Sequence, residues 1–219
     1  MKIKKVFNLD EMKGNIYFMS DLHIGHENVI QFDHRPFSSL QEMNDSIVKD
    51  LQTKLKPEDV LFDLGDMFWE VPWVTCKSIL DSIPVEKLYE CPGNHHIAGN
   101  YYGPQAKLSC CFTELADIFD ITVMKNKKTY RLSLSHFPII DWNHKARGGL
   151  MIHGHCHGQI DKFNSSSPAL RVDVGYSSGL AKENGSFLVP FDKILDHFYK
   201  KTNGREFFDW ATDTYTDFS

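Results

Sequence analysis

Seven side chains that bind metal ions well follow short apolar segments of this chain. Five such segments exist, and each one leads into one or more of these residues. The seven are, in chain order, Asp21, His23, Asp66, Asn94, His136, His155 and His157. A single tetrahedral zinc takes only three or four protein ligands. The set therefore predicts two divalent ions that share one bridging carboxylate, and Asp66 is the natural bridge.

Such a pair of ions is suited to phosphoryl chemistry. Two ions about 3.5–4 Å apart can hold a phosphoryl group and lower the pKa of a water between them toward about 7. The leaving oxygen then needs a proton, and His95, directly after Asn94, is the candidate general acid. Imidazole-rich sites suit transition metals rather than calcium. We expect manganese, with iron, zinc or nickel as alternatives.

The elements that must position these residues are expected to be strands. The five apolar segments cover residues 15–20, 60–64, 87–91, 131–135 and 150–152. Open α/β sheets bind ligands at the carboxyl ends of neighbouring strands, which is where this pattern places the seven residues. Later strands are expected over 170–174 and 187–189. The segments 121–124 and 129–135 are expected to form a hairpin, since the second alternates apolar and polar residues.

Helices are expected between and after these strands. Ser39–Leu55 is the clearest, because Ser39 and Glu42 form a capping-box pattern before an apolar face. Further helices are predicted at 72–83, 104–118 and 191–199. The acidic, aromatic tail at 205–219 could pack on the body or fray. The mixture predicts one α/β domain over 1–219, with its motif core at about 15–190 and two sheets packed face to face.

Size and composition fit a protein that needs no metal to fold. A chain of 219 residues buries about 70% of its unfolded surface. The net charge of −5 argues against a protein that coats long nucleic acid. Five cysteines without a CxxC pair suit a reducing compartment. No signal peptide and no membrane-spanning run is visible, so we expect a soluble cytoplasmic protein without membrane contact. The oligomeric state is not indicated.

The ordered motifs resemble those of the calcineurin-like metallophosphoesterases. That family carries D-x-H, G-D, G-N-H-D/E, H and G-H-x-H, and this chain has Asp21-Leu22-His23, Gly65-Asp66, Gly93-Asn94-His95-His96, His136 and Gly154-His155-Cys156-His157 in order. The longer sequence segments around these motifs are similar to those of a small bacterial and phage-type subfamily, so the protein could be phage-encoded.

The resemblance implies a four-layer αββα sandwich with two mixed β-sheets. It also implies that one ion is held by Asp21, His23, Asp66 and His157, and the other by Asp66, Asn94, His136 and His155. The chain departs from the family at His96, where an acidic residue usually supports the catalytic histidine.

Several residues have a simpler interpretation beside the functional one. Asn94 could serve only the turn after Gly93, and His95 could be a surface histidine. Arg35 could grip phosphate oxygens or form a surface ion pair. His26 could contact substrate or be an ordinary loop residue. His153 is expected to support a ligand from its strand.

The residues and the resemblance together predict a two-metal phosphoester hydrolase. A phosphodiesterase acting on a nucleotide or short nucleic acid through a metal-bridging hydroxide is favoured, because 219 residues leave no room for a large capping domain. A phosphomonoesterase is the alternative, and a non-catalytic scaffold is a further one. The loops at 28–38, 69–73 and 100–109 are expected to decide the substrate.

Overall fold

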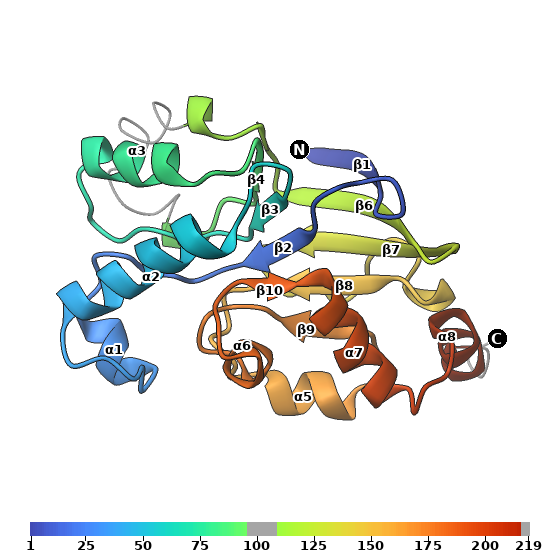
Figure 1. Cartoon of the computed structure of the whole chain (residues 1–219). Coiled ribbons are helices and arrows are strands. Elements are labelled where there is room, and N and C mark those ends of the chain that lie inside the picture. The colour runs from blue at the N-terminus through green and yellow to red at the C-terminus, as the bar shows by residue number, and fades with distance from the viewer. Residues whose placement is uncertain (96–108, 216–219) are drawn as a thin grey trace.

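Two mixed five-stranded sheets pack face to face in the computed structural model, which describes residues 1–95 and 109–215 (Figure 1). The β2 sheet has the order β10 (Val189–Pro190), β2 (Ile16–Met19), β3 (Val60–Asp63), β4 (Lys87–Glu90) and β5 (Glu114–Leu115). The β7 sheet has the order β1 (Lys2–Asn8), β6 (Ile118–Lys125), β7 (Lys128–Ser135), β8 (Leu150–His153) and β9 (Arg171–Asp173). The expected α/β class and two-sheet sandwich are confirmed.

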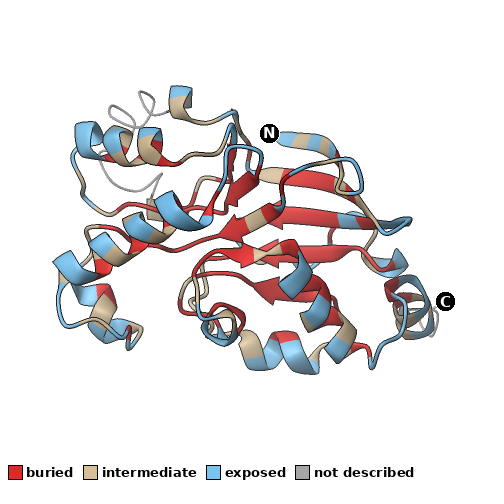
Figure 2. Cartoon of the chain, viewed as in Figure 1, coloured by how far each residue is buried: buried red, intermediate tan, exposed pale blue. Residues whose placement is uncertain are grey.

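The core lies between the two sheets. Phe18 stacks on Phe62 from the neighbouring strand, and Phe62 meets Phe119 of the other sheet edge to face at 5.7 Å between ring centroids. Strands β3 and β8 are buried along their whole length, as the red strands of Figure 2 show. Strands buried on both faces have continuous apolar sequences, which explains why these segments were recognisable.

The outer face of the β2 sheet is covered by α2 (Leu40–Lys54) and α3 (Trp73–Ser82). Ser39 caps α2 by accepting a hydrogen bond from the backbone N–H of Glu42, as the capping-box pattern predicts. Met43, Ile47 and Leu51 fall on one face of this helix and are fully buried against Leu61 and its neighbours. The expected helices at 39–55 and 72–83 are therefore confirmed within a residue at each end.

The outer face of the β7 sheet has a thinner cover. Helix α5 (Asp161–Ser166) lies over β9, where Asn164 binds Arg171, and Trp142 packs on Met151 beside it. At the other end of the sheet, Lys4 and Val6 of β1 are exposed. This edge of the sandwich is therefore open to solvent.

Four further helices lie in the described part of the chain. They are α1 (Asn28–Phe32), α6 (Gly179–Asn184), α7 (Phe191–Lys201) and α8 (Phe207–Tyr215), with short 3-10 turns at Ser109–Cys111 and Lys145–Arg147. The tail forms α8 and packs on the body, since Phe207 and Ala211 are buried. Among the described helices, none is long and apolar enough to cross a membrane.

Two expectations about elements turn out differently. The helix expected over 104–118 is wrong for its described part, where a 3-10 turn, β5 and the start of β6 follow one another. There the backbone forms hydrogen bonds with β4 instead of helical ones: Thr113 N–H donates to the carbonyl of Leu88, and Ala116 N–H to that of Glu90. The hairpin is confirmed, with Ile121 opposite Leu132 and left-handed Asn126 and Lys127 at the turn.

The strand directions bring the expected ligands to one edge. β2, β3 and β4 run parallel to one another, and so do β7, β8 and β9. A parallel bridge between Ser20 and Gly175 joins the carboxyl ends of β2 and β9, which belong to different sheets. The segments that follow five strands therefore meet at the junction of the two sheets.

Candidate metal centre

The first group of facing side chains consists of Asp21, His23 and His157. One ligand atom from each lies within 4.8 Å of the other two. His157 Nε2 is 3.5 Å from Asp21 Oδ1 and 3.2 Å from His23 Nε2. Two imidazole nitrogens and a carboxylate oxygen pointing at one place form a donor set that suits a divalent transition metal.

The second group is built around Asp66 and His136. His136 Nε2 lies 3.3 Å from Asp66 Oδ2 and 3.0 Å from Asn94 Oδ1. Asp66 and His136 also share a group with Asp21. Asp66 thus faces both halves of the site, which is the placement that a bridging carboxylate requires.

One buried atom shows that the residues fit a cation. Asp21 is fully buried, yet its Oδ1 has no hydrogen-bond partner among the described residues. A buried carboxylate oxygen without a partner is costly unless a positive charge satisfies it. Its neighbours at 3.5 and 3.9 Å are the Nε2 atoms of His157 and His23. A metal ion among these three atoms would supply the missing partner.

The backbone of the site is held in an uncommon conformation. Asp21, His23, Asp66, His155 and His157 all have φ between 48° and 68°. Left-handed backbone costs free energy for residues with a β-carbon, and such residues gather at functional sites. Here these residues lie in the segments that directly follow β2, β3 and β8.

Two glycines of the motifs allow close approach to the carboxylates. A β-carbon at Gly93 would lie 2.1 Å from Asp66 Oδ1. At Gly154 it would lie 1.9 Å from Ser20 Oγ and 2.5 Å from Asp21 Oδ2. Both contacts are too short for any side chain, so glycine is required where the two loops cross the acidic residues.

Hydrogen bonds orient two of the candidate ligand histidines. His136 Nδ1 donates to the carbonyl of Leu64 at 2.7 Å, and His157 Nδ1 donates to Asp33 Oδ2 at 2.6 Å. Because Nδ1 carries the proton in each ring, Nε2 is directed at the site. Such outer contacts fix the tautomer of a metal-binding histidine.

Arg35 does not lie where a phosphate contact would need it. It is buried, and its guanidinium donates to the carbonyls of Leu22 and Asp21 at 2.7 and 2.8 Å. It also pairs with Asp33 at 3.2 Å. The structure therefore makes Arg35 a support for the Asp21–His23 turn, and both expectations for it, substrate contact and surface ion pair, need correction.

Asp33 and Ser177 were not found from the sequence. Asp33 Oδ2 accepts hydrogen bonds from His157, Arg35 and Ser177 together. No motif marks Asp33, because it reaches His157 across 124 positions of the chain and depends on the path of the loop after α1. Its place between two residues already singled out, His26 and Arg35, was the only signal available.

Opposite charges shift the pKa values of the metal-free site. Burial alone would raise the pKa of Asp21, but His157 at 3.5 Å and the other nearby histidines bring it below its usual range. Burial opposes protonation of His157, yet the nearby carboxylates of Asp21 and Asp33 raise its pKa to about 10. The pKa of His136 is also raised, through Asp66, despite burial. Burial lowers the pKa of His23 to about 3.

His155 takes a looser place than the other expected ligands. It belongs to none of the three groups formed by the described residues. Its ring centroid lies 5.1 Å from that of His136 and 4.7 Å from that of Phe137, and its backbone N–H donates to Asp21 Oδ2. His153 is buried, with Nε2 3.2 Å from the Asn164 amide. His96 lies outside the described residues.

An aromatic stack borders the second half of the site. Trp69 lies parallel to His26, at 4.1 Å between ring centroids, and meets His95 edge to face at 4.4 Å. His95 Nε2 is 3.9 Å from Asp66 Oδ2, its backbone N–H donates to Asp66 Oδ1, and its side chain is 33% exposed. His95 is thus both beside the candidate ligands and open to an incoming molecule. Trp69 belongs to the 69–73 loop that was expected to decide the substrate, although no role beside His95 was expected for its ring.

Comparisons with known proteins give the fold and no activity. No protein-family model matches the chain. A stretch of 52 residues is 38% identical to an uncharacterized protein of Methanocaldococcus jannaschii, and it covers 24% of this chain and 30% of that protein. The crystal structure of a protein of unknown function from Aquifex aeolicus matches with a TM-score of 0.59 and 22% identity, over 85% of this chain and 100% of that one. This likeness supports the two-sheet architecture.

Proposed function

We propose that the protein is a dinuclear-metal-dependent phosphoester hydrolase of the calcineurin-like type that the motifs resemble. The overlapping groups of facing Asp and His atoms carry the proposal, because Asp66 and Asp21 join them into one site. Two bound divalent ions would supply positive charge at the phosphoryl oxygens and a water of lowered pKa. We take manganese as the first candidate metal, then iron, zinc or nickel.

The positions of the candidate ligands assign them to two ions. Asp21, His23 and His157 would hold one ion, while Asn94 and His136 would hold the other, with Asp66 between them. His155, whose ring centroid is 5.1 Å from that of His136, would join the second set. The strained turns and the Nδ1 hydrogen bonds keep these atoms in place before a metal arrives, so little ordering is left for binding.

His95 is proposed as the general acid. It is the exposed member of the group that it forms with His23 and Asp66. A proton on its ring can reach the leaving oxygen of a phosphoester seated over the site. Trp69 packs against the ring and limits its rotation, a task that the missing acidic residue after His95 would otherwise share.

Phosphodiesters are proposed as the preferred substrates. A phosphomonoester carries one more negative charge and gains more from nearby cations. Arg35 is buried with its donors engaged by protein groups, so it offers no charge to such a phosphate. A nucleotide or short nucleic-acid phosphodiester is the substrate class we propose. A cytoplasmic location is proposed with it, supported by five free cysteines.

The test compares two nitrophenyl substrates at saturating manganese. Bis-nitrophenyl phosphate should be turned over faster per active site than nitrophenyl phosphate. Faster turnover of the monoester by about tenfold, which corresponds to roughly 1.4 kcal/mol in the barrier, would replace the diesterase with the phosphatase. If metal stimulates no turnover of cyclic nucleotides, dinucleotides or short RNA, the non-catalytic scaffold becomes the favoured alternative.

A further inference from the structure

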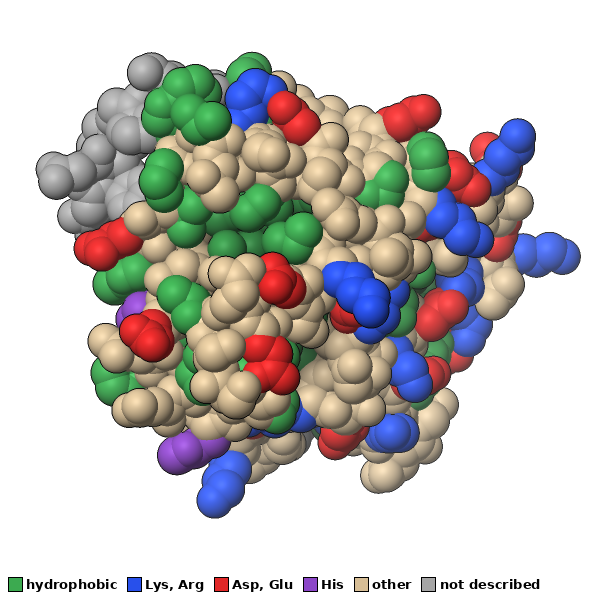
Figure 3. Space-filling model, turned by 60° about the vertical axis from the view of Figure 1, so that its left-hand side comes forward, with side chains coloured by type: hydrophobic (Ala, Val, Ile, Leu, Met, Phe, Trp, Pro, Cys, Tyr) green, Lys and Arg blue, Asp and Glu red, His purple; other side chains and the backbone are tan. Residues whose placement is uncertain are grey.

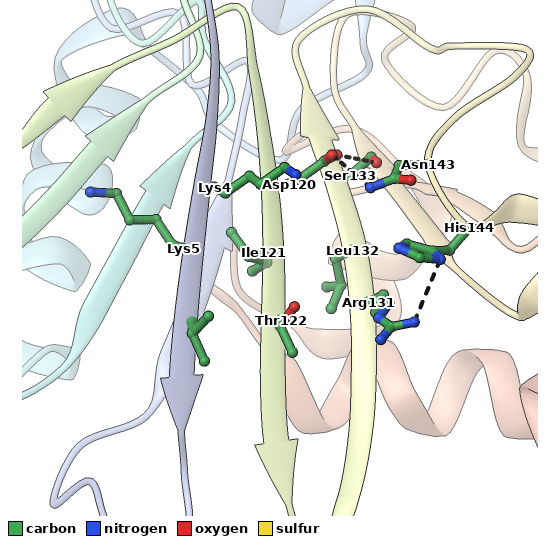
Figure 4. A pocket seen from close by; sticks show the side chains of 11 residues that line it. Lys4, Lys5, Asp120, Ile121, Thr122, Arg131, Leu132, Ser133, Asn143 and His144 are labelled. Atoms are coloured by element: carbon green, nitrogen blue, oxygen red, sulfur yellow. Dashed lines mark hydrogen bonds between the residues drawn. The ribbon is translucent and has the colours of Figure 1, made fainter.

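A pocket of about 250 Å³ lies on the open outer face of the β7 sheet, away from the candidate metal centre (Figure 4). Its walls include Lys4, Thr122, Arg131, Ser133, Asn143 and His144. Cross-strand register explains the arrangement, because Lys4 is paired with Asp120 and Asp120 with Ser133. Arg131 is the fourth residue of β7, and His136 follows the end of that strand. The five residue steps from one position to the other separate the two sites by roughly 16 Å along the strand.

The floor of the pocket is a carboxylate whose charge is already compensated. Asp120 is only 8% exposed and accepts hydrogen bonds from Ser133 Oγ at 2.7 Å and Asn143 Nδ2 at 2.9 Å. Lys2 Nζ pairs with it at 2.8 Å. Burial would raise the pKa of Asp120, but these three donors lower it. Asp120 therefore has no charge left to balance Lys4 and Arg131, which line the same pocket.

Lys5 also lines the pocket and pairs with Glu114, but Lys4 and Arg131 have no carboxylate partner among the described residues. The chain has five arginines. Arg35 and Arg205 each pair with an aspartate, and Arg171 binds Asn164 and a backbone carbonyl. Arg131 and Arg147 form no ion pair within the described part of the chain, and the same holds for Lys4.

The positive potential is felt by His144, which lies in the same pocket. Arg131 Nη1 is 3.5 Å from His144 Nδ1. Burial first, and then Arg131, Arg147 and Lys4, lower the pKa of His144. On the face in Figure 3, by contrast, acidic and basic side chains lie next to one another. The unbalanced cations at this pocket are thus a local feature of a protein whose net charge is −5.

We propose that this pocket binds the phosphate group of a second ligand, with Arg131 and Lys4 as its principal contacts. A planar guanidinium can donate two parallel hydrogen bonds to phosphate oxygens, and an ammonium adds a point charge. Two unpaired cations, with Arg147 near them, match the multiple charge of a phosphate better than the single charge of a carboxylate. The proposal is independent of hydrolysis at the metal centre.

Isothermal titration of pyrophosphate into the chelator-treated full chain tests the site. Wild-type protein should bind, and Arg131→Gln should weaken binding by about tenfold to a hundredfold, as expected for the loss of charge-assisted hydrogen bonds. Lys4→Gln should act in the same direction. Lys49→Gln on α2 removes an exposed lysine from the far side of the molecule and should leave the affinity unchanged. Melting temperatures of all variants report whether each one is folded.

A second titration identifies the source of the phosphate. An unphosphorylated single-stranded decanucleotide that binds more tightly than pyrophosphate, and that also needs Arg131, would support the site with a nucleic-acid strand as ligand. Binding of pyrophosphate alone would support it with a free nucleotide or oligophosphate. If neither probe binds, or if both Arg131→Gln and Lys4→Gln bind like wild type, the proposal is overturned.

Discussion

The candidate metal centre and the outer-face pocket treat charge in opposite ways. In the metal centre, Asp21, His23 and His136 are buried and face one another, and Asp21 Oδ1 has no hydrogen-bond partner among the described residues. In the pocket, the one buried charge, Asp120, has three donors, and the unpaired cations are exposed. Burying an unpaired charge is costly, while exposing one is not.

The difference indicates how each region depends on a ligand. Burying a set of facing candidate ligands costs free energy in the metal-free protein, and a bound metal ion would remove that cost. Substitutions of these residues should therefore have large effects on activity and on metal binding. In the pocket the buried carboxylate of Asp120 has its partners without any ligand. Substitutions there should therefore change the stability of the fold or the binding of an anion, and leave turnover alone. The same substitution, aspartate to asparagine, at Asp66 in one region and at Asp120 in the other tests this difference.

The largest effect is expected for Asp66→Asn. Asparagine keeps the size of the side chain but removes the charge that both halves of the site share, so nearly all turnover should disappear. The fold should remain, because a domain of this size has a core that does not need metal. Turnover and circular dichroism should be measured on the same preparation. Retained turnover, or gross unfolding, would contradict the assignment of Asp66 as the bridge.

His95→Asn should have the next largest effect. Loss of a general acid typically costs about 10²–10⁴-fold in rate. Metal content should stay the same, because the other residues near Asp66 remain. The loss should shrink for nitrophenyl esters, whose leaving group needs little protonation. Equal losses for good and poor leaving groups would instead assign His95 to metal binding or to substrate positioning.

Manganese binding should become weaker as the pH falls. In the metal-free protein the pKa of His157 is raised to about 10, so this ring is protonated at neutral pH, and the pKa of His136 is raised in the same direction. A metal must displace such protons, and each one released weakens the apparent affinity by about tenfold per pH unit of acidification. Calorimetry in two buffers with different ionisation heats counts the protons. Binding without proton release would show that His157 is not a ligand.

The candidate metal centre was more predictable from the sequence than its surroundings. Asp21, Asp66 and His136 follow apolar segments that could only be buried strands, and parallel strands bring their ends together. Asp33 and Trp69 depend instead on how loops pass over those ends. Strand β1 was missed because three of its first four residues are lysines. In addition, Lys4 and Val6 lie on a face that stays open to solvent.

The outer-face pocket was not predicted at all, for a physical reason. Lys4, Asp120 and Arg131 meet only through the register of three strands, one of them unrecognised. Charged residues in a strand are read as a solvated face, and their separation in the sequence hides that they share a hollow. Such a site becomes visible only when the strand order is known.

The smallest effect is expected for Asp120→Asn, the matched change in the pocket. The new amide places a donor where Ser133, Asn143 and Lys2 all donate, so one buried donor loses its acceptor. That should lower the free energy of unfolding by about 1–3 kcal/mol, measured by urea denaturation. Turnover per folded site should match wild type, because Asp120 lies on the outer face of the β7 sheet. A loss of turnover comparable to that of Asp66→Asn would mean that the two regions are coupled, and the contrast drawn between them would fail.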